Sequence, residues 1–181
     1  GITPALGESP RQAVDAAVAA ASNQGCLVSL DVNYRKNLWS AHEAKAVLSG
    51  VLPHVDVLFA SDEEFALLTH GHANPMGYLR DDCGIREVVL KHGVGGSTVH
   101  GPDGVHHEAA LTVDAVDTVG AGDAFAAGYL SGLLDGVSIP ERVRRGTAAG
   151  AFAVSTEGDW EGAPSRADLE LLSLSAGEAL R

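Results

Sequence analysis

The chain has 181 residues, enough for one domain with a hydrophobic core and too few to suggest two. Its 24 acidic residues outnumber its 12 lysines and arginines, and the net charge of −12 at pH 7 argues against an extended surface for nucleic acid. Cys26 and Cys83 lack zinc-type spacing, and the sequence has neither an apolar run of bilayer length nor a signal-peptide pattern. We therefore expect a cytoplasmic protein without membrane or nucleic-acid partners.

Helical and short apolar segments alternate along the first half of the chain. Ser9 as N-cap, Pro10 as the first helical residue and Gly25 just past the end predict an alanine-rich first helix. Short apolar runs of strand length follow at residues 26–32, 55–60 and 86–91. Helices between fully apolar strands indicate a mostly parallel sheet that is covered on both faces.

Local capping and turn signals divide the rest of the chain. Ser40 with Glu43 and Ser61 with Glu64 form Ser-x-x-Glu patterns, which predict capping boxes at two helix starts. A short helix is expected after residues 74–75. The sequence GPDG at 101–104 predicts an antiparallel hairpin at the edge of the sheet. Three further helices are predicted, one within residues 116–134 and the others over residues 139–156 and 165–174.

The segment DTVGAGDAF, residues 117–125, contains the chemistry that the sequence suggests most directly. Gly120 and Gly122 allow a ligand to approach the backbone closely, and the helix that begins there presents free N–H groups to an anion. Asp123 in the first turn could accept a proton from a substrate hydroxyl beside that anion site. The alternative is that Asp123 only stabilises the positive end of a helix, a role worth about 0.3 to 1 kcal/mol.

DTVGAGDAFAAGYL, residues 117–130, resembles the C-terminal signature of the ribokinase-like (PfkB) sugar kinases. In that family the residue matching Asp123 is the catalytic base, and the backbone matching Gly120, Ala121 and Gly122 forms the anion hole. The resemblance implies a ribokinase-like three-layer α/β/α sandwich, with a mostly parallel sheet and an antiparallel edge hairpin. It also implies ATP and Mg as cofactors.

The order of motifs is similar to that of the 2-keto-3-deoxygluconate kinases of the family. SLDVNYRKNLWS, VDVLFASDEEFALL, VVLKHGVGGS, the signature and STEGDWEGAP follow one another along the chain. These kinases phosphorylate the terminal, 6-hydroxyl group of a six-carbon keto acid with ATP. The expected partners are therefore a small-molecule sugar acid and ATP, and fructokinase or another sugar kinase of the family is the alternative.

Arg35 is the residue that the resemblance assigns to the substrate acid. A guanidinium can bind a carboxylate through two parallel N–H···O bonds, although a solvated loop arginine is the simpler reading of the residue alone. Asp159 matches a second substrate-contacting position, and a surface aspartate is its alternative. Nucleotide contacts are implied for Asn33, Tyr34, Ser61, Lys91, Gly93, Gly96, Gly120, Gly122 and Thr147.

Glu64 and Thr147 each have two readings. The family motif that organises Mg and phosphate has Asn where this chain has Ser61 but keeps the Glu, so Glu64 is a weak metal candidate. The capping box accounts for the same Ser61 and Glu64 without a metal. Thr147 matches a position that lines the adenine pocket, and packing between helices is its alternative.

Residues 1–181 match only the C-terminal portion of a single ribokinase-like kinase domain. The family's first strands, its glycine-bearing sugar contacts and its small β-sheet lid have no counterpart here. We expect weak activity if these residues act alone, because water would be poorly excluded from the site. An uncovered sheet edge could favour a homo-oligomer, and a nucleotide-binding module without activity is a further alternative.

Overall fold

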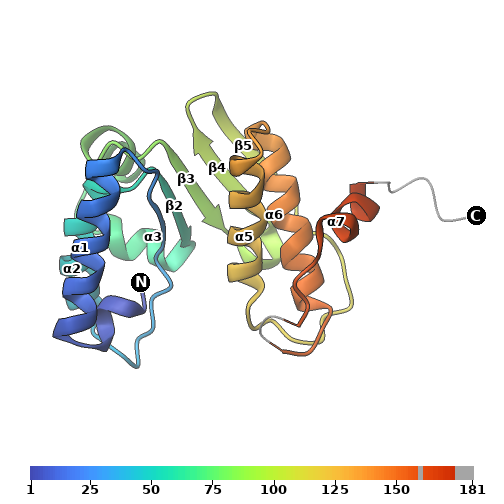
Figure 1. Ribbon diagram of the computed structural model, residues 1–181, viewed down its shortest axis with the longest axis horizontal. Coiled ribbons are helices and arrows are strands. Elements are labelled where there is room, and N and C mark those ends of the chain that lie inside the picture. Colours follow the sequence, from blue (N-terminus) through green and yellow to red (C-terminus); the bar gives the residue numbers. More distant parts are fainter. Residues whose placement is uncertain (159–160, 174–181) are drawn as a thin grey trace, which may run out of the picture. The chain divides into compact units, whose positions relative to one another are not determined.

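The computed structural model describes residues 1–158 and 161–173 (Figure 1). They form two compact units, the first from residues 1–92 and 98–105, and the second from residues 93–97 and from residue 106 onward. Unit 1 contains η1 (Thr3–Leu6), α1 (Glu8–Gln24), β1 (Ser29–Asp31), α2 (Ala41–Val51), η2 (Leu52–His54), β2 (Val57–Ser61), α3 (Asp62–Thr69), α4 (Pro75–Gly77), the π-helix η3 (Tyr78–Asp82) and β3 (Glu87–Lys91). Unit 2 contains η4 (Gly93–Gly95), α5 (Ala121–Leu134), α6 (Ile139–Val154) and α7 (Arg166–Ser173).

The strands form one mixed sheet in the order β1-β2-β3-β4-β5, with β4 at Ser97–Gly101 and β5 at Gly104–Glu108. β1, β2 and β3 are parallel, and Asp31 stands opposite Phe59 while Ser61 stands opposite Lys91. Two residues connect β4 to β5, a link short enough only for an antiparallel hairpin. The predicted α/β fold, with parallel strands and an edge hairpin, is confirmed.

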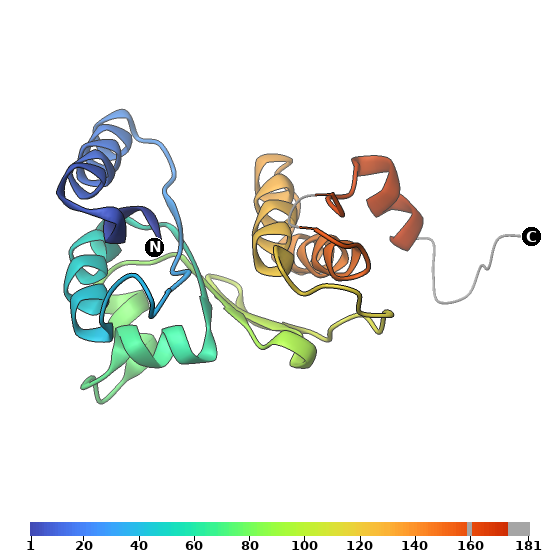
Figure 2. The same cartoon turned by 90° about the horizontal axis from the view of Figure 1, so that it is seen from below.

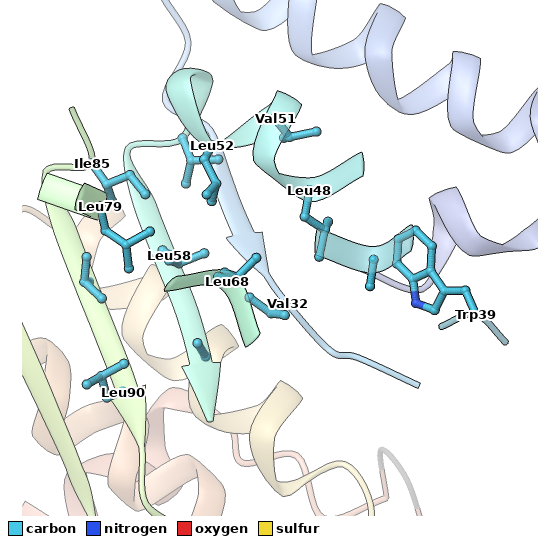
Figure 3. Close-up of a cluster of buried hydrophobic side chains, with 14 residues drawn as sticks. Val32, Trp39, Leu48, Val51, Leu52, Leu58, Leu68, Leu79, Ile85 and Leu90 are labelled. Carbon is cyan, nitrogen blue, oxygen red and sulfur yellow. The ribbon is translucent and has the colours of Figure 1, made fainter. Parts of the chain in front are cut away.

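The core of unit 1 lies where α2 and α3 pack on β2 and β3. Leu58, Val88 and Leu48 are fully or almost fully buried there, together with Val32 and Trp39 at the two ends of the loop after β1 (Figure 3). The neighbouring strand residues Phe59 and Val89 are also buried, so both faces of these strands are covered. This explains why their sequences are continuously apolar rather than alternating.

The predicted helices are present, and one predicted start is wrong. The N-cap of α1 is Gly7 rather than Ser9, since the Gly7 carbonyl accepts the first helical N–H, from Arg11, at 3.1 Å. Pro10 therefore lies within the first turn of the helix. Backbone N–H groups in the first turn have no helical acceptor, so a residue without an N–H breaks no helical hydrogen bond there. Gly25 lies just past the end of the helix, as predicted, and it has the left-handed conformation.

α5 and α6 pack side by side in unit 2 (Figures 1 and 2). Small residues line their contact: a Cβ on Gly128 would stand 2.7 Å from the Arg145 carbonyl, and one on Gly146 would stand 2.9 Å from the Phe125 carbonyl. Both distances are too short for a larger residue, so these glycines set the spacing of the helices. Within residues 1–158 and 161–173, no helix combines the length and the hydrophobicity that a bilayer crossing requires.

Candidate functional site

The carboxyl ends of the three parallel strands gather most of the predicted site residues of unit 1. β1 ends at Asp31, β2 at Ser61 and β3 at Lys91, and strands that run parallel end at the same edge of their sheet. The predicted residues at this edge are Asn33, Tyr34, Arg35, Ser61, Glu64 and Lys91. This is the edge at which open α/β sheets bind their ligands.

Glu64 joins the start of α3 to the loop after β1. Its Oε2 accepts the Ser61 N–H at 2.8 Å, and the Ser61 hydroxyl accepts the Glu64 N–H at 3.2 Å, so the predicted capping box is confirmed. Its other oxygen, Oε1, accepts the Tyr34 N–H at 2.7 Å, a contact across 30 residues that the sequence did not reveal. Glu64 therefore positions one of the candidate ligand-binding residues.

These contacts bear on the predicted metal role of Glu64. Each of its carboxylate oxygens already accepts a backbone N–H. No group of three or more His, Cys, Asp or Glu side chains in the described part of the chain is arranged to hold a metal ion. The described residues do not fit a metal held by the protein alone. The hydrogen bonds of Glu64 give it a structural role, and metal binding stays a prediction.

Lys91 is bound to a residue that the motifs did not single out. Its Nζ lies 2.6 Å from Oδ2 of Asp31, and both side chains are only 20% exposed. Oδ1 of Asp31 accepts the Asn33 N–H at 3.3 Å. Asn33 has a φ of +35°, and it is the one non-glycine residue with positive φ among the described residues. The ion pair and the unusual backbone thus meet at the start of the same loop.

The loop of residues 32–39 presents Arg35 to solvent from two buried anchors. Val32 is fully buried and Trp39 is 7% exposed, and both belong to the core cluster (Figure 3). Between them, the Arg35 side chain is exposed and its guanidinium makes no hydrogen bond or ion pair within the described residues. A free guanidinium on a loop that is fixed at both ends is suited to binding an anion.

The glycines after β3 form a turn. Gly93 and Gly96 have positive φ values of 58° and 89°, and the Gly96 N–H donates to the Gly93 carbonyl at 3.0 Å. A Cβ on Gly96 would also collide with the backbone of Glu108, so the turn requires glycine there for packing as well. The geometry of the turn thus accounts for both glycines, and their contact with nucleotide stays a prediction.

His92 precedes this turn and bridges two elements of unit 1. Its Nδ1 lies 2.8 Å from Oδ1 of Asp62 at the start of α3, and its Nε2 lies 2.9 Å from the Thr98 hydroxyl on β4. The histidines on β5 behave differently: His107 is exposed, and the adjacent His106 is partly buried, as expected for neighbours on opposite faces of a strand.

The second group of predicted residues lies at the start of α5 in unit 2. Gly120 is the N-cap, with a left-handed φ of +74°, and no side chain caps the helix. The first backbone N–H groups of α5 therefore have neither helical acceptors nor a capping side chain, although the Ala121 N–H donates to the Thr118 carbonyl of the preceding turn at 3.4 Å. Asp123 lies in this first turn; it is exposed, and its carboxylate has no partner within the described residues.

The preceding loop shapes the approach to this helix. Asp117 Oδ1 accepts the Val119 N–H at 3.0 Å, and the N–H groups of residues 116 and 117 donate to the Val154 carbonyl at the end of α6. Thr147 lies on α6 with its Oγ1 buried and without a hydrogen-bond partner in the described part of the chain. The predicted substrate contact Asp159 falls outside the described residues.

A separate cavity of 390 Å³ lies in unit 1 between the N-terminal residues, β1 and α2. Asn33 and Asp31 line it, together with Pro4, Leu48 and Val51. Asn33 is the one predicted site residue on its wall, so this cavity does not gather the candidate residues.

Comparisons with known proteins find relatives among the carbohydrate kinases. A family model described as pfkB family carbohydrate kinase matches residues 5–166. A 2-dehydro-3-deoxygalactonokinase of Haloferax volcanii is 32% identical, over 88% of this chain and 51% of that protein. The 2-dehydro-3-deoxygluconokinase of Bacillus subtilis is 35% identical, over 93% and 53%. A fructokinase of Escherichia coli is 34% identical, over 90% and 56%.

Solved structures show the same fold. The crystal structure of a putative ribokinase II from E. coli in complex with ATP and Mg²⁺ superposes with a TM-score of 0.84 at 27% identity. The match covers 92% of this chain and 55% of that one. The fold is therefore ribokinase-like, as predicted. The chain spans about half the length of the curated relatives that it matches.

Proposed function

Because the chain belongs to the pfkB family of carbohydrate kinases, we propose that it forms the C-terminal portion of a single ribokinase-like kinase domain. We propose further that this kinase transfers the γ-phosphoryl group of ATP to the 6-hydroxyl of 2-keto-3-deoxygluconate. The observation that carries the proposal is Asp123, an exposed and unpaired carboxylate in the first turn of α5, beside backbone N–H groups that no side chain caps.

The proposed chemistry follows from this juxtaposition. Asp123 accepts the proton of the 6-hydroxyl, whose oxygen attacks the γ-phosphorus while the bond to the β,γ-bridging oxygen breaks and ADP leaves. The backbone N–H groups of residues 120–123 stabilise the negative charge on the phosphoryl oxygens. Mg²⁺ that arrives with ATP would neutralise phosphate charge, and the described side chains are not arranged to hold it by themselves.

Arg35 supports an acid as the acceptor. Its guanidinium is exposed and has no carboxylate partner among the described residues, and so it can bind the substrate's acid group through two N–H···O bonds. Neutral sugars would gain nothing from this residue. The relatives include kinases named for sugar acids and one named for fructose, at similar identity, and so the acid preference rests on Arg35.

The catalytic assignment is tested by replacing Asp123 with Asn. We expect the Asp123→Asn variant to release ADP more slowly than the parent by about 10²- to 10⁴-fold, the range that general base catalysis contributes. Asp114→Asn, an exposed aspartate in the loop before α5, is the matched control and should retain the parent rate. Equal rates for the parent and Asp123→Asn would show that another group takes the proton.

The acceptor is tested with 2-keto-3-deoxygluconate, fructose and ribose in parallel. We expect turnover of the keto acid alone, and its loss in Arg35→Ala but not in Lys36→Ala, which removes the neighbouring exposed cation. Similar turnover of fructose by the parent and by Arg35→Ala would favour a fructokinase. A nucleotide-binding module without activity would be stabilised by ATP, by about 2.7 kcal/mol at 100 times the Kd, and yet release no ADP.

A further inference from the structure

The Lys91–Asp31 ion pair is a close contact in unit 1 that the proposed chemistry leaves unused. It joins the last residue of β3 to the last residue of β1, across the intervening strand β2. At 2.6 Å and 20% exposure on each side, the two charges are partly desolvated. Removing one partner would leave the other charge without compensation in a partly buried place, so the two side chains depend on each other.

The ion pair also restrains the loop of residues 32–39, because Asp31 binds the backbone of that loop. While Oδ2 binds Lys91, Oδ1 accepts the Asn33 N–H at 3.3 Å. Asn33 has a φ of +35°, a conformation that costs energy for a non-glycine residue and persists where the surroundings determine it. Without Lys91, the Asp31 carboxylate would be free to turn toward solvent, and this support of Asn33 would weaken.

The next residues of the loop are held from the other side. The Tyr34 N–H donates to Glu64 at 2.7 Å, the Tyr34 hydroxyl donates to the Trp39 carbonyl at 3.3 Å, and the Val32 N–H donates to the Phe59 carbonyl at 3.0 Å. The backbone on the N-terminal side of Arg35 is therefore fixed by two carboxylates, Asp31 and Glu64. The Arg35 side chain is the exposed and unpaired member of the loop.

We propose that Lys91 and Asp31 are positioning residues that hold the 32–39 loop in the conformation in which Arg35 meets the acid group of the substrate. This inference rests on the proposed function, because it takes Arg35 as the acid-binding residue. It assigns Lys91 a role different from phosphate binding. Lys91 acts through Asp31 on the sugar-acid side of the reaction, and the pair reduces the ordering that the loop must undergo when the acid binds.

The test compares Lys91→Met, Asp31→Asn and the double variant with the parent chain. Amide hydrogen exchange of Asn33 and Tyr34, measured without ligand, should be faster by roughly tenfold in each variant, the effect of losing one charged hydrogen bond. The affinity for 2-keto-3-deoxygluconate should fall by a similar factor, and by more than the affinity for ATP, which Asn33 and Tyr34 are also predicted to contact. The double variant should be no worse than either single one, because all three remove the same contact.

Two control variants separate positioning from general loss of structure. Lys91→Arg keeps the positive charge beside Asp31 and should restore most of the protection of the Asn33 amide. Lys45→Met removes a lysine of α2 that donates to the His70 carbonyl, outside residues 32–39, and should change neither exchange nor affinity. Loss of protection throughout β3 in Lys91→Met would indicate unfolding of that variant. The inference would then be tested by the exchange and the affinity of Asp31→Asn alone.

The outcomes distinguish this inference from the proposed function. If Lys91→Met bound ATP more weakly and the keto acid with unchanged affinity, the inference would be overturned. Lys91 would then be assigned to binding the phosphates of ATP. Unchanged exchange of Asn33 and Tyr34 would overturn it as well. If the parent chain itself does not bind the keto acid, the acid-binding role of Arg35 fails, and the exchange data still show whether the pair holds the loop.

Discussion

Gly120 sets the backbone geometry at the start of α5. Its φ of +74° is strained for a residue with a side chain, since the left-handed conformation costs about 1–2 kcal/mol outside glycine. We expect Gly120→Ala to lower the free energy of unfolding by that amount in urea titrations. Gly50→Ala is the matched control: Gly50 lies in α2 with no atom within 4 Å of a Cβ, and alanine there should stabilise the chain by about 0.5 kcal/mol.

Equal unfolding free energies for the two glycine variants would show that the left-handed conformation of Gly120 is not required. If the strain at residue 120 instead tilts the first turn of α5, the Asp123 carboxylate moves with it. Gly120→Ala would then also lower kcat for the keto acid, whereas Gly50→Ala would leave kcat unchanged.

Residue by residue, the sequence predicted local features better than distant contacts. The capping boxes at Ser40 and Ser61 follow from local patterns of four residues. The structural partner of Lys91 could not be predicted, because Asp31 lies 60 residues earlier and no local pattern links the two. The role of Glu64 was half predicted: the capping box is local, whereas its bond to Tyr34 depends on the parallel pairing of β1 with β2.

At the scale of elements, α2 and α3 begin with the same kind of capping box, and comparing the two distinguishes capping from ligand binding. Ser40 caps α2 and Ser61 caps α3, and each serine accepts the N–H of a glutamate at 3.2 Å. We expect Ser40→Ala and Ser61→Ala each to lower the free energy of unfolding by about 1 kcal/mol, measured by chemical denaturation. Ser61 is also a predicted nucleotide contact, so only Ser61→Ala should weaken ATP binding. Equal ATP affinities would leave Ser61 with capping alone.

Helix boundaries show where pattern reasoning succeeds and fails. The starts of α2 and α3 were predicted correctly, because a capping box specifies its position by two reciprocal bonds. The start of α1 was predicted two residues too late. Proline is tolerated throughout the first turn, so Pro10 does not mark the first helical residue, and Gly7 takes the N-cap without any side-chain signal.

At the scale of the whole molecule, acid stability depends on carboxylates in both units. Hydrogen bonds from Ser40 lower the pKa of Glu43 below 4.5, and hydrogen bonds from Arg145 and Arg166 lower the pKa of Asp135 below 3.8. A carboxyl group whose pKa is lower in the folded state binds its proton more readily after unfolding. Its stabilisation is complete above the unfolded pKa and is lost as the pH falls through the folded one.

We therefore expect the thermal midpoint to fall steadily as the pH is lowered from about 5 toward 3. Asp135 lies just after α5 and binds Arg145 of α6 at 2.6 Å and Arg166 of α7 at 2.8 Å. Asp135→Asn should be less stable than the parent at pH 7 and should show a shallower decline in acid. The parent and Asp135→Asn falling in parallel would show that this carboxylate is not a source of the acid sensitivity.

The architecture of the whole chain was more predictable than its site. The alternation of helices with continuously apolar strands was sufficient to predict the parallel sheet, because strands that are buried on both faces are apolar at nearly every position. The hairpin followed from a turn sequence. Side-chain contacts between strand ends require the register of three strands at once, and the sequence does not state that register.

Trp39 gives the loop that carries Arg35 an optical signal of its own. The indole is buried in the core of unit 1, and the backbone carbonyl of Trp39 accepts a hydrogen bond from the Tyr34 hydroxyl of the same loop. Indole emission depends on the polarity around the ring, so a rearrangement of the loop would change its wavelength. With Trp160 replaced by Phe, Trp39 would be the sole tryptophan, and the arrival of a sugar acid could be followed in real time by fluorescence.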